Sequence, residues 1–343
     1  MERRSIALGV AIGAVCMLLG AIGCIAQPKG RLNPYDPSAI FTGATNWQVK
    51  TAAAAFSARG GHSVVVYNSK MWLIGGYDGA ACLNDVWSSP NGIAWTPATA
   101  SAAFTGRTRH ACLVFNGKMW IIAGLFEPAG ITDVTNDVWY SGDGVSWVCA
   151  KQKAAFIRRF QFGAAVFNNC MWVVAGSTNN NNPSDLTNDV WYSKDGTNWN
   201  AANDGAPFDI RNGCSLLVHN EKLWLIAGSG AGPYYRDVWS SPDGTNWTQA
   251  VATAPFFTRS SFYGAVFHNR IVLIGGYHPS FGAAGCTNDV WLSPDGIQWT
   301  NVLAFPAFAK RYRHAAVAFD EKIWLIGGNT TPTTRANDVW CSE

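Results

Sequence analysis

Six arginines recur at one fixed place relative to an apolar segment of this chain. Each stands 13 residues before a tryptophan, or before Val272, which replaces the tryptophan in one copy. The six are Arg59, Arg107, Arg159, Arg211, Arg259 and Arg311. A guanidinium group presents a planar fork of donors that matches a carboxylate, sulfate or phosphate, so six of them around one site would bind an anion.

Six aspartates offer the same arginines a structural role. Each begins an Asp-Val-Trp segment, and these segments recur as often as the arginines do. They are Asp85, Asp137, Asp189, Asp237, Asp289 and Asp338. Partly buried charges need partners, and residues found in every copy of a repeat usually maintain the repeat itself. We expect most pairs to be structural and the additional Arg109, Arg313 and Arg335 to attract anions, while all six arginines, Arg109 and Arg313 stay candidate ligand-binding residues.

The segments that differ between the copies supply aromatic side chains beside polar ones. Each follows an apolar run that ends in glycine, as residues 72–76 do. Their candidate ligand-binding residues are Tyr77, Phe126, Tyr234, Tyr235, Tyr277 and His278. Flat rings beside hydrogen-bonding groups suit a carbohydrate or a peptide, although a protein with few charges also exposes single aromatics by default.

Neither catalysis nor a metal is predicted from the residue types. His62, His110 and His314 each follow a recurring arginine by three residues, and three imidazoles suit zinc or copper. No carboxylate at a suggestive spacing completes such a ligand set, and there is no Ser-His-Asp signature. We therefore expect no cofactor and no metal. If the site is enzymatic, Glu127 and His278 are the best-placed acid and base.

One unit, written six times, positions these residues. The tryptophans of the Asp-Val-Trp segments are separated by 52, 52, 48, 52 and 49 residues, and all 17 tryptophans fall at three repeat positions. In the first unit we expect strands near 62–67, 71–74, 85–88 and 93–97. Asn-Ser, Gly-Gly and Asn-Gly turn signals separate them.

A four-stranded unit of about 50 residues with a glycine pair and spaced tryptophans resembles a kelch repeat, and six of them resemble a six-bladed β-propeller. The resemblance covers residues 41–343 and implies an all-β fold. It also implies that the recurring arginines surround one mouth of a central channel, on the face that carries the variable loops. The sequence departs from the kelch pattern where Ala123, Ala175 and Ala227 replace the first glycine of the pair.

The two ends of the repeat region predict how the ring closes. The last unit stops at Glu343 after its third strand, and Trp47 lies in a copy of the fourth-strand motif. We predict that residues 45–51 supply the missing fourth strand beside residues 338–341, because an open ring would leave an edge strand unpaired.

The N-terminal segment predicts export. Arg3 and Arg4 precede an uncharged, mostly apolar run over residues 5–26, as in a secretory signal. Residues 21–24 resemble a bacterial lipobox ending at Cys24, with alanine where leucine is usual. Lipidation of Cys24, cleavage after Ala26 and an uncleaved anchor stay open. We predict a signal at 1–23, a tether at 24–40, and a periplasmic, cell-surface or secreted propeller.

Composition excludes several classes of protein. The chain is 48% hydrophobic and 14% charged, which excludes disorder and predicts a dense core. A net charge of +3 without a run of lysines or arginines argues against nucleic acid. The cysteines beyond Cys24 form no CxxC pair, so they fit neither a zinc site nor a dense disulfide framework.

We expect a monomeric binding or interaction module that docks a carbohydrate or protein ligand on one propeller face. Contact with a membrane would come only from an N-terminal lipid or an uncleaved anchor. Bacterial sialate mutarotases are also kelch propellers, so the resemblance implies an alternative, a small sugar-active enzyme acting on an acidic sugar at the same face. Fold alone does not choose between them, whereas a paired acid and base would mark the enzyme.

Overall fold

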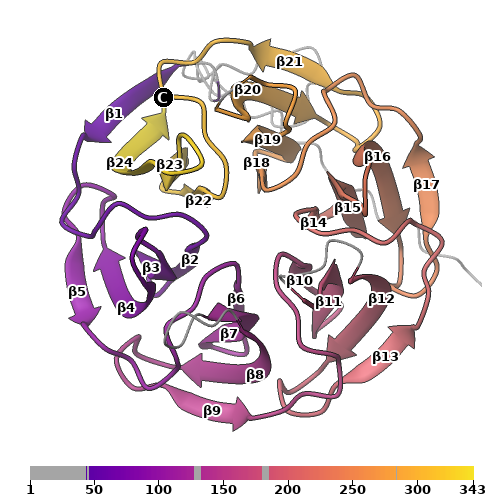
Figure 1. Cartoon of the computed structure of the whole chain (residues 1–343), viewed down its shortest axis with the longest axis horizontal. Coiled ribbons are helices and arrows are strands. Elements are labelled where there is room, and N and C mark those ends of the chain that lie inside the picture. The colour runs from indigo at the N-terminus through magenta and orange to yellow at the C-terminus, as the bar shows by residue number, and fades with distance from the viewer. Residues whose placement is uncertain (1–43, 45, 127–132, 180–184, 283) are drawn as a thin grey trace, which may run out of the picture. The chain divides into compact units, whose positions relative to one another are not determined.

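The computed structural model describes residues 44, 46–126, 133–179, 185–282 and 284–343. These belong to a compact unit, Ile40–Glu343. Within it, six sheets of four antiparallel strands form a ring (Figure 1). The predicted signal and tether lie outside the described residues. None of the described residues belongs to a helix that is both long and apolar enough to cross a bilayer.

The blades follow one another along the chain, each with its innermost strand first. Blade 1 contains β2 (Ser63–Tyr67), β3 (Lys70–Tyr77), β4 (Cys82–Ser89) and β5 (Thr96–Thr99). Blade 2 contains β6 (Ala111–Phe115), β7 (Lys118–Phe126), β8 (Asp133–Ser141) and β9 (Val148–Lys151), and blade 3 contains β10 (Gly163–Phe167), β11 (Cys170–Ser177), β12 (Leu186–Ser193) and β13 (Asn200–Asn203). Blade 4 contains β14 (Ser215–His219), β15 (Lys222–Ser229), β16 (Tyr234–Ser241) and β17 (Thr248–Val251). Blade 5 contains β18 (Tyr263–Phe267), β19 (Arg270–Tyr277), β20 (Cys286–Ser293) and β21 (Thr300–Leu303), and blade 6 contains β22 (Ala315–Phe319), β23 (Lys322–Asn329), β24 (Arg335–Ser342) and β1 (Trp47–Thr51).

The predicted closure of the ring is confirmed. Strand β1 pairs antiparallel with β24, with Trp47 opposite Ser342 and Val49 opposite Trp340 (Figure 1). The Glu343 amide also donates a hydrogen bond to the Asn46 carbonyl at 2.8 Å. The two ends of the propeller thus share one blade, and β24 is not left as an open edge.

The expected fourth strand of blade 1 begins too early. Ile93 and Ala94 lie in a turn, where their amides donate to the Asn91 side-chain oxygen at 3.0 Å. Those amides are therefore not available to pair with β4, and the strand starts at Thr96. The second strand is longer than expected, because it continues through the glycine pair to Tyr77 with a bulge between Ile74 and Gly76.

The bulge explains why only one glycine of each pair is replaced by alanine. The second position has φ between 102° and 119° in all six blades, a region that side chains disfavour. The first position has φ between 52° and 61°, in the left-handed region. Alanine is accommodated there at Ala123, Ala175 and Ala227.

The core lies between the blades and consists of recurring aromatic contacts. In blade 2, Trp147 meets Phe104 edge to face at 5.3 Å, and Phe104 is 1% exposed. The turn glycine Gly144 lies so close to Trp72 of blade 1 that a Cβ atom would overlap the indole ring. The turn glycines of blades 1 to 5 all lie against a tryptophan of the preceding blade in this way, which fixes these blades to their neighbours.

Candidate functional site

The six recurring arginines are buried in their blades. The Nη atoms of Arg259 donate to the Asp289 carboxylate at 2.8 and 2.7 Å, and Nη1 also donates to the Gly275 carbonyl at 2.8 Å. All six arginines are 0–1% exposed and have a corresponding aspartate. The pairs are Arg59–Asp85, Arg107–Asp137, Arg159–Asp189, Arg211–Asp237, Arg259–Asp289 and Arg311–Asp338. The six recurring arginines therefore have the structural role rather than the anion-binding one, and other side chains line the mouth.

The aspartate of the blade 5 pair is held ionised by several donors. In blade 5, Trp291 Nε1 donates to the Asp289 carboxylate at 2.6 Å, beside the bonds from Arg259. Burial alone raises the pKa of Asp289, but the hydrogen bonds and charge of Arg259, with the Trp291 bond, bring it below its usual value. This pair therefore stays charged at neutral pH.

A closed circle of backbone hydrogen bonds forms the mouth. Its members stand two residues after the buried arginines and have left-handed φ between 52° and 67°. They are Gly61, Arg109, Gln161, Gly213, Ser261 and Arg313. Each amide donates to the carbonyl of its counterpart in the preceding blade at 2.7–3.0 Å, with Gly61 returning to Arg313. The circle satisfies the backbone and makes the mouth rigid.

The mouth is narrow. The circle lines a cavity of about 130 Å³, and Gln161 Nε2 donates across it to Ser261 Oγ at 2.8 Å. A separate cavity of about 620 Å³ is lined by the six innermost strands, largely by valine, alanine and leucine side chains. A sizeable polar ligand would therefore lie on the face around the mouth rather than inside the channel.

The three aligned histidines fill space between the blades. The His110 ring is so close to Gly75 of blade 1 that a Cβ there would come within 3.1 Å of it. His62 meets Gly327 and His314 meets Gly275 in the same way. Where the preceding blade has alanine, the corresponding residues are Phe162, Cys214 and Phe262, and they pack with Ala123, Ala175 and Ala227. Where the preceding blade has glycine, the imidazole ring thus takes up the space that the alanine methyl group fills in the other blades.

These histidines are neutral. Burial, followed by the neighbouring arginine, lowers the pKa of His62 and of His110 to about 3. Their ring nitrogens and those of His314 have no partner with hydrogen-bond geometry in the described part of the chain. The described part of the chain contains no group of three or more histidine, cysteine, aspartate or glutamate side chains that could hold a metal ion.

A continuous row of aromatic rings from segments of blades 4, 5 and 6 lies on the mouth face. We call it the aromatic stripe, and in spatial order it contains Phe257, Phe281, His278, Tyr234, Tyr277 and Tyr312. Successive ring centres are 4.7–6.3 Å apart. Phe257 at the outer end is 64% exposed, whereas Tyr312 at the inner end is 6% exposed. The stripe leads inward to Arg313, whose guanidinium lies 5.2 Å from the Tyr312 ring centre.

The other predicted aromatics lie elsewhere. Tyr235 covers the buried Arg211, with the guanidinium 4.4 Å from its ring centre. Tyr77 stacks with Arg335 at 4.7 Å, close to the inner end of the stripe. Phe126 lines a separate groove between blades 2 and 3. The structure thus brings Tyr234, Tyr277 and His278 together and separates Tyr235 and Phe126 from them.

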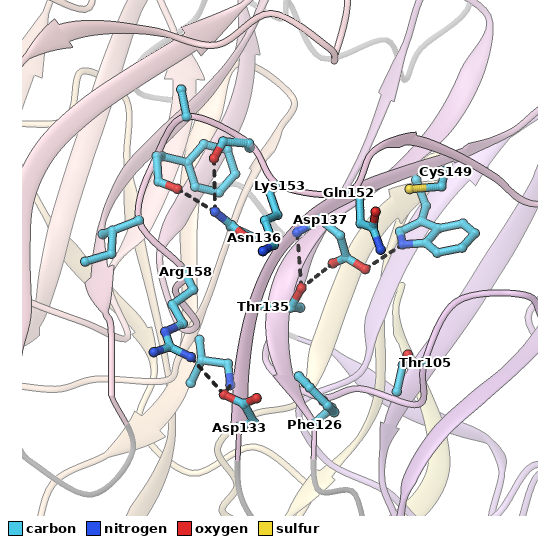
Figure 2. A pocket seen from close by; sticks show the side chains of 16 residues that line it. Thr105, Phe126, Asp133, Thr135, Asn136, Asp137, Cys149, Gln152, Lys153 and Arg158 are labelled. Carbon is cyan, nitrogen blue, oxygen red and sulfur yellow. Dashed lines mark hydrogen bonds and ion pairs between the residues drawn. The ribbon is translucent and has the colours of Figure 1, made fainter.

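The groove beside Phe126 has a volume of about 1060 Å³ (Figure 2). Its polar groups are engaged in the repeat itself: Asn136 Nδ2 donates to the Phe156 carbonyl at 2.9 Å, and Thr135 Oγ1 donates to Asp137 at 2.8 Å (Figure 2). Arg158 pairs with Asp133 at 3.2 Å. These internal partners make the groove a weaker candidate than the aromatic stripe. The alternative acid Glu127 lies outside the described residues.

Phe281 lies in one of the variable segments that the sequence analysis singles out, but two other members of the stripe, Phe257 and Tyr312, lie outside those segments. Phe257 directly follows a recurring phenylalanine, at a position that differs in every blade, and that variability is the signal that marks it. Tyr312 lies between Arg311 and Arg313, and the two arginines rather than the tyrosine suggest a function for this segment. Only the ring geometry shows that both contact residues of blade 5.

Comparison with known proteins supports the fold. A model described as the kelch motif matches residues 58–88. The dynein alpha chain of the flagellar outer arm of Chlamydomonas reinhardtii is 37% identical over 79 residues, which span 22% of this chain and 2% of the dynein chain. The solved structure of YjhT matches with a TM-score of 0.69 and 16% identity, over 84% of this chain and 96% of that chain. At that identity the likeness supports the propeller architecture alone.

Proposed function

This chain is a six-bladed β-propeller with a kelch motif, and we propose that it is a binding module whose aromatic stripe docks a carbohydrate. The observation that carries the proposal is the stripe's continuity: six rings, supplied by segments of three blades, lie in mutual contact on one face. Residues that hold the repeat together are present in every blade, whereas the residues of the stripe are not. Blade 4 also departs from the repeat close to Tyr234 in sequence, because Arg236 replaces the asparagine that precedes the aspartate in the other five blades.

The chemistry of the stripe favours a sugar ligand. The face of a pyranose ring carries C–H groups that pack on an aromatic ring, while its hydroxyl groups need hydrogen-bond partners at the edge. Tyr234 and Tyr277 combine an apolar ring with a polar end. A row of such rings matches successive sugar units of an oligosaccharide.

Removing one central ring should weaken sugar binding at least tenfold. A stacked aromatic contributes its buried area and about 0.5–1.5 kcal/mol in addition, and about 1.4 kcal/mol corresponds to tenfold in affinity. We expect this loss for Tyr234→Ala, measured by calorimetry with the best ligand from a glycan array. Phe305→Ala removes a phenylalanine that is 86% exposed and outside the stripe, and it should bind as the parent does. A parent protein that binds no glycan, or a Tyr234→Ala variant with unchanged affinity, would contradict the proposal.

An enzyme acting on an acidic sugar at the same face is the alternative. Its mark would be a paired acid and base. His278 Nδ1 instead accepts a hydrogen bond from the Ser280 amide at 3.0 Å, and its ring packs on Tyr234. Burial lowers the pKa of His278. These contacts suit a packing and binding role, so the binding module is favoured.

We also propose that the protein acts outside the cytoplasm, anchored by lipid at Cys24. The support is the sequence of residues 1–26, which lie outside the described part of the chain. Wild-type protein should partition into detergent, and Cys24→Ser should release it to the aqueous phase. A water-soluble wild type that begins at Gln27 would exclude the lipid and leave export by simple cleavage.

A further inference from the structure

We propose that the inner end of the aromatic stripe is an anion site, in which Arg313 and Arg335 receive the carboxylate of an acidic saccharide. This inference rests on the proposed function and specifies its ligand. It comes from a contrast within one chain: six arginines are each matched by an aspartate, and two arginines beside the stripe are not.

Arg313 has no counter-ion in the described part of the chain. Its guanidinium makes no hydrogen bond or ion pair there, and its buried Nε has no partner. Its neighbours are the rings of Tyr312, Tyr277 and Tyr234 and the charge of Arg335. Desolvation lowers the pKa of Arg313, and Arg335 lowers it further, but an arginine remains protonated at neutral pH. A desolvated cation without a partner is unfavourable, and an incoming anion offsets that cost.

Arg335 adds a second unmatched charge. Its guanidinium stacks on Tyr77, and Nη1 donates to the Thr333 carbonyl at 3.1 Å. Its Nε is also buried without a partner, and no carboxylate among the described residues pairs with it. Asp78 precedes Gly79, which lies against the Arg335 guanidinium. The Asp78 carboxylate, however, accepts from the Ala80 and Ala81 amides at 2.8 Å and forms no ion pair with Arg335. Two guanidinium groups that influence each other electrostatically thus lack a paired carboxylate among the described residues.

The dimensions indicate which part of the ligand lies where. Arg313 lines the mouth cavity of about 130 Å³, whereas pockets that enclose a drug-sized ligand measure roughly 300–1,000 Å³. The cavity therefore suits a single carboxylate rather than a sugar ring. The ring itself would lie on Tyr312 and Tyr277, which places the acidic group at the end of the ligand nearest the mouth.

The experiment compares each acidic sugar with its own methyl ester. Oligogalacturonate and a sialylated oligosaccharide are titrated by calorimetry into the full chain, beside their methyl-esterified forms. We expect at least tenfold tighter binding of an acid than of its ester, with a preference that shrinks as salt rises.

The informative variant is Arg313→Gln. Gln161 occupies the same position of blade 3 with φ 53°, against 52° at Arg313, so the chain already accommodates glutamine there. This variant should bind acid and ester within about twofold of each other. Arg158→Gln removes a charge that is 59% exposed and paired with Asp133, and it should keep the wild-type preference.

The outcomes separate this inference from the proposed function. Equal binding of acid and ester by the wild type, or an unchanged preference in Arg313→Gln, would overturn the anion site while the stripe still binds sugar. Failure of the wild type to bind any sugar would overturn both. Binding of a polyglutamate peptide without binding of the acidic sugars would replace the saccharide with an acidic protein partner.

Discussion

Replacing Arg259 by methionine is expected to lower the free energy of unfolding by about 3–5 kcal/mol, the usual cost of removing one partner of a buried ion pair. The variant leaves Asp289 buried, at 7% exposure, without the two Nη donors that hold its carboxylate. The Gly275 carbonyl loses its arginine donor as well. Urea denaturation followed by tryptophan fluorescence measures the change.

The control removes an arginine of the same face that is not buried. Arg158→Met breaks an exposed pair with Asp133 and should change stability by less than about 0.5 kcal/mol. The double variant Arg259→Met/Asp289→Leu removes both charges and should recover part of the loss. An Arg259→Met variant as stable as the parent would show that the pair does not hold the blade together.

Acid titration of the same proteins gives a second readout. The pKa of Asp289 is lowered in the folded protein, so the unfolded chain binds a proton first and the pair stabilises the fold above about pH 4, the ordinary aspartate pKa. That contribution disappears as pH falls through the folded pKa. Arg259→Met should instead gain stability on acidification near this pH, because burial alone raises the pKa of Asp289.

The propeller was predictable from the repeat in the sequence. Short β-prone runs recur in every blade, Asp-Gly or Asn-Gly turns recur in five, and tryptophan recurs at three fixed positions with Val272 as its one replacement, so each local signal is supported by its copies. Closure was predictable because Trp47 belongs to the repeat but stands far from the unit that needs it. The pairing of buried arginines with aspartates followed from their equal numbers and from the cost of isolated buried charge.

The mouth was not predictable in the same way. Its circle of hydrogen bonds depends on left-handed φ at residues as different as Gly61, Gln161 and Arg313, so no residue type marks it. Arg311 and Arg313 are indistinguishable as sequence letters, yet one is paired with Asp338 and the other is unmatched. The backbone distinguishes them, because Arg313 has a left-handed φ of 52° at the circle of the mouth and Arg311 does not.

The coupling of histidine with glycine lies between these cases. The exchange of His110 for Phe162 accompanies the exchange of Gly75 for Ala123, and both changes are visible in the sequence. Their connection is a contact between neighbouring blades, so it becomes apparent only when the order of the blades is known. A residue that departs from the repeat in one blade should therefore be compared with the departures in the adjacent blade that it contacts.

Removing β1 is expected to destabilise the propeller by more than any single substitution within that strand. A chain that begins at Ala52 loses the whole of β1 and leaves the edge of β24 unpaired. Trp47 alone is 5% exposed, meets Phe308 at 5.0 Å and donates its indole N–H to the Ala44 carbonyl at 2.9 Å. Trp47→Ala should therefore cost about 3–5 kcal/mol, and the truncated chain more, in urea denaturation.

The matched controls lie in the same strand and at the same end. Val49 is 47% exposed, so Val49→Thr should change stability by less than about 0.5 kcal/mol although it lies two residues from Trp47. A chain that begins at Gly43 keeps β1 and the Ala44 carbonyl, and it should unfold at the same urea concentration as the full chain. If the chain that begins at Ala52 matched it, closure through β1 would not stabilise the ring. We expect the Ala52 chain to be the least stable and to associate through β24. The reason is that β1 has two roles: it places Trp47 in the hydrophobic core, and it pairs with the edge of β24.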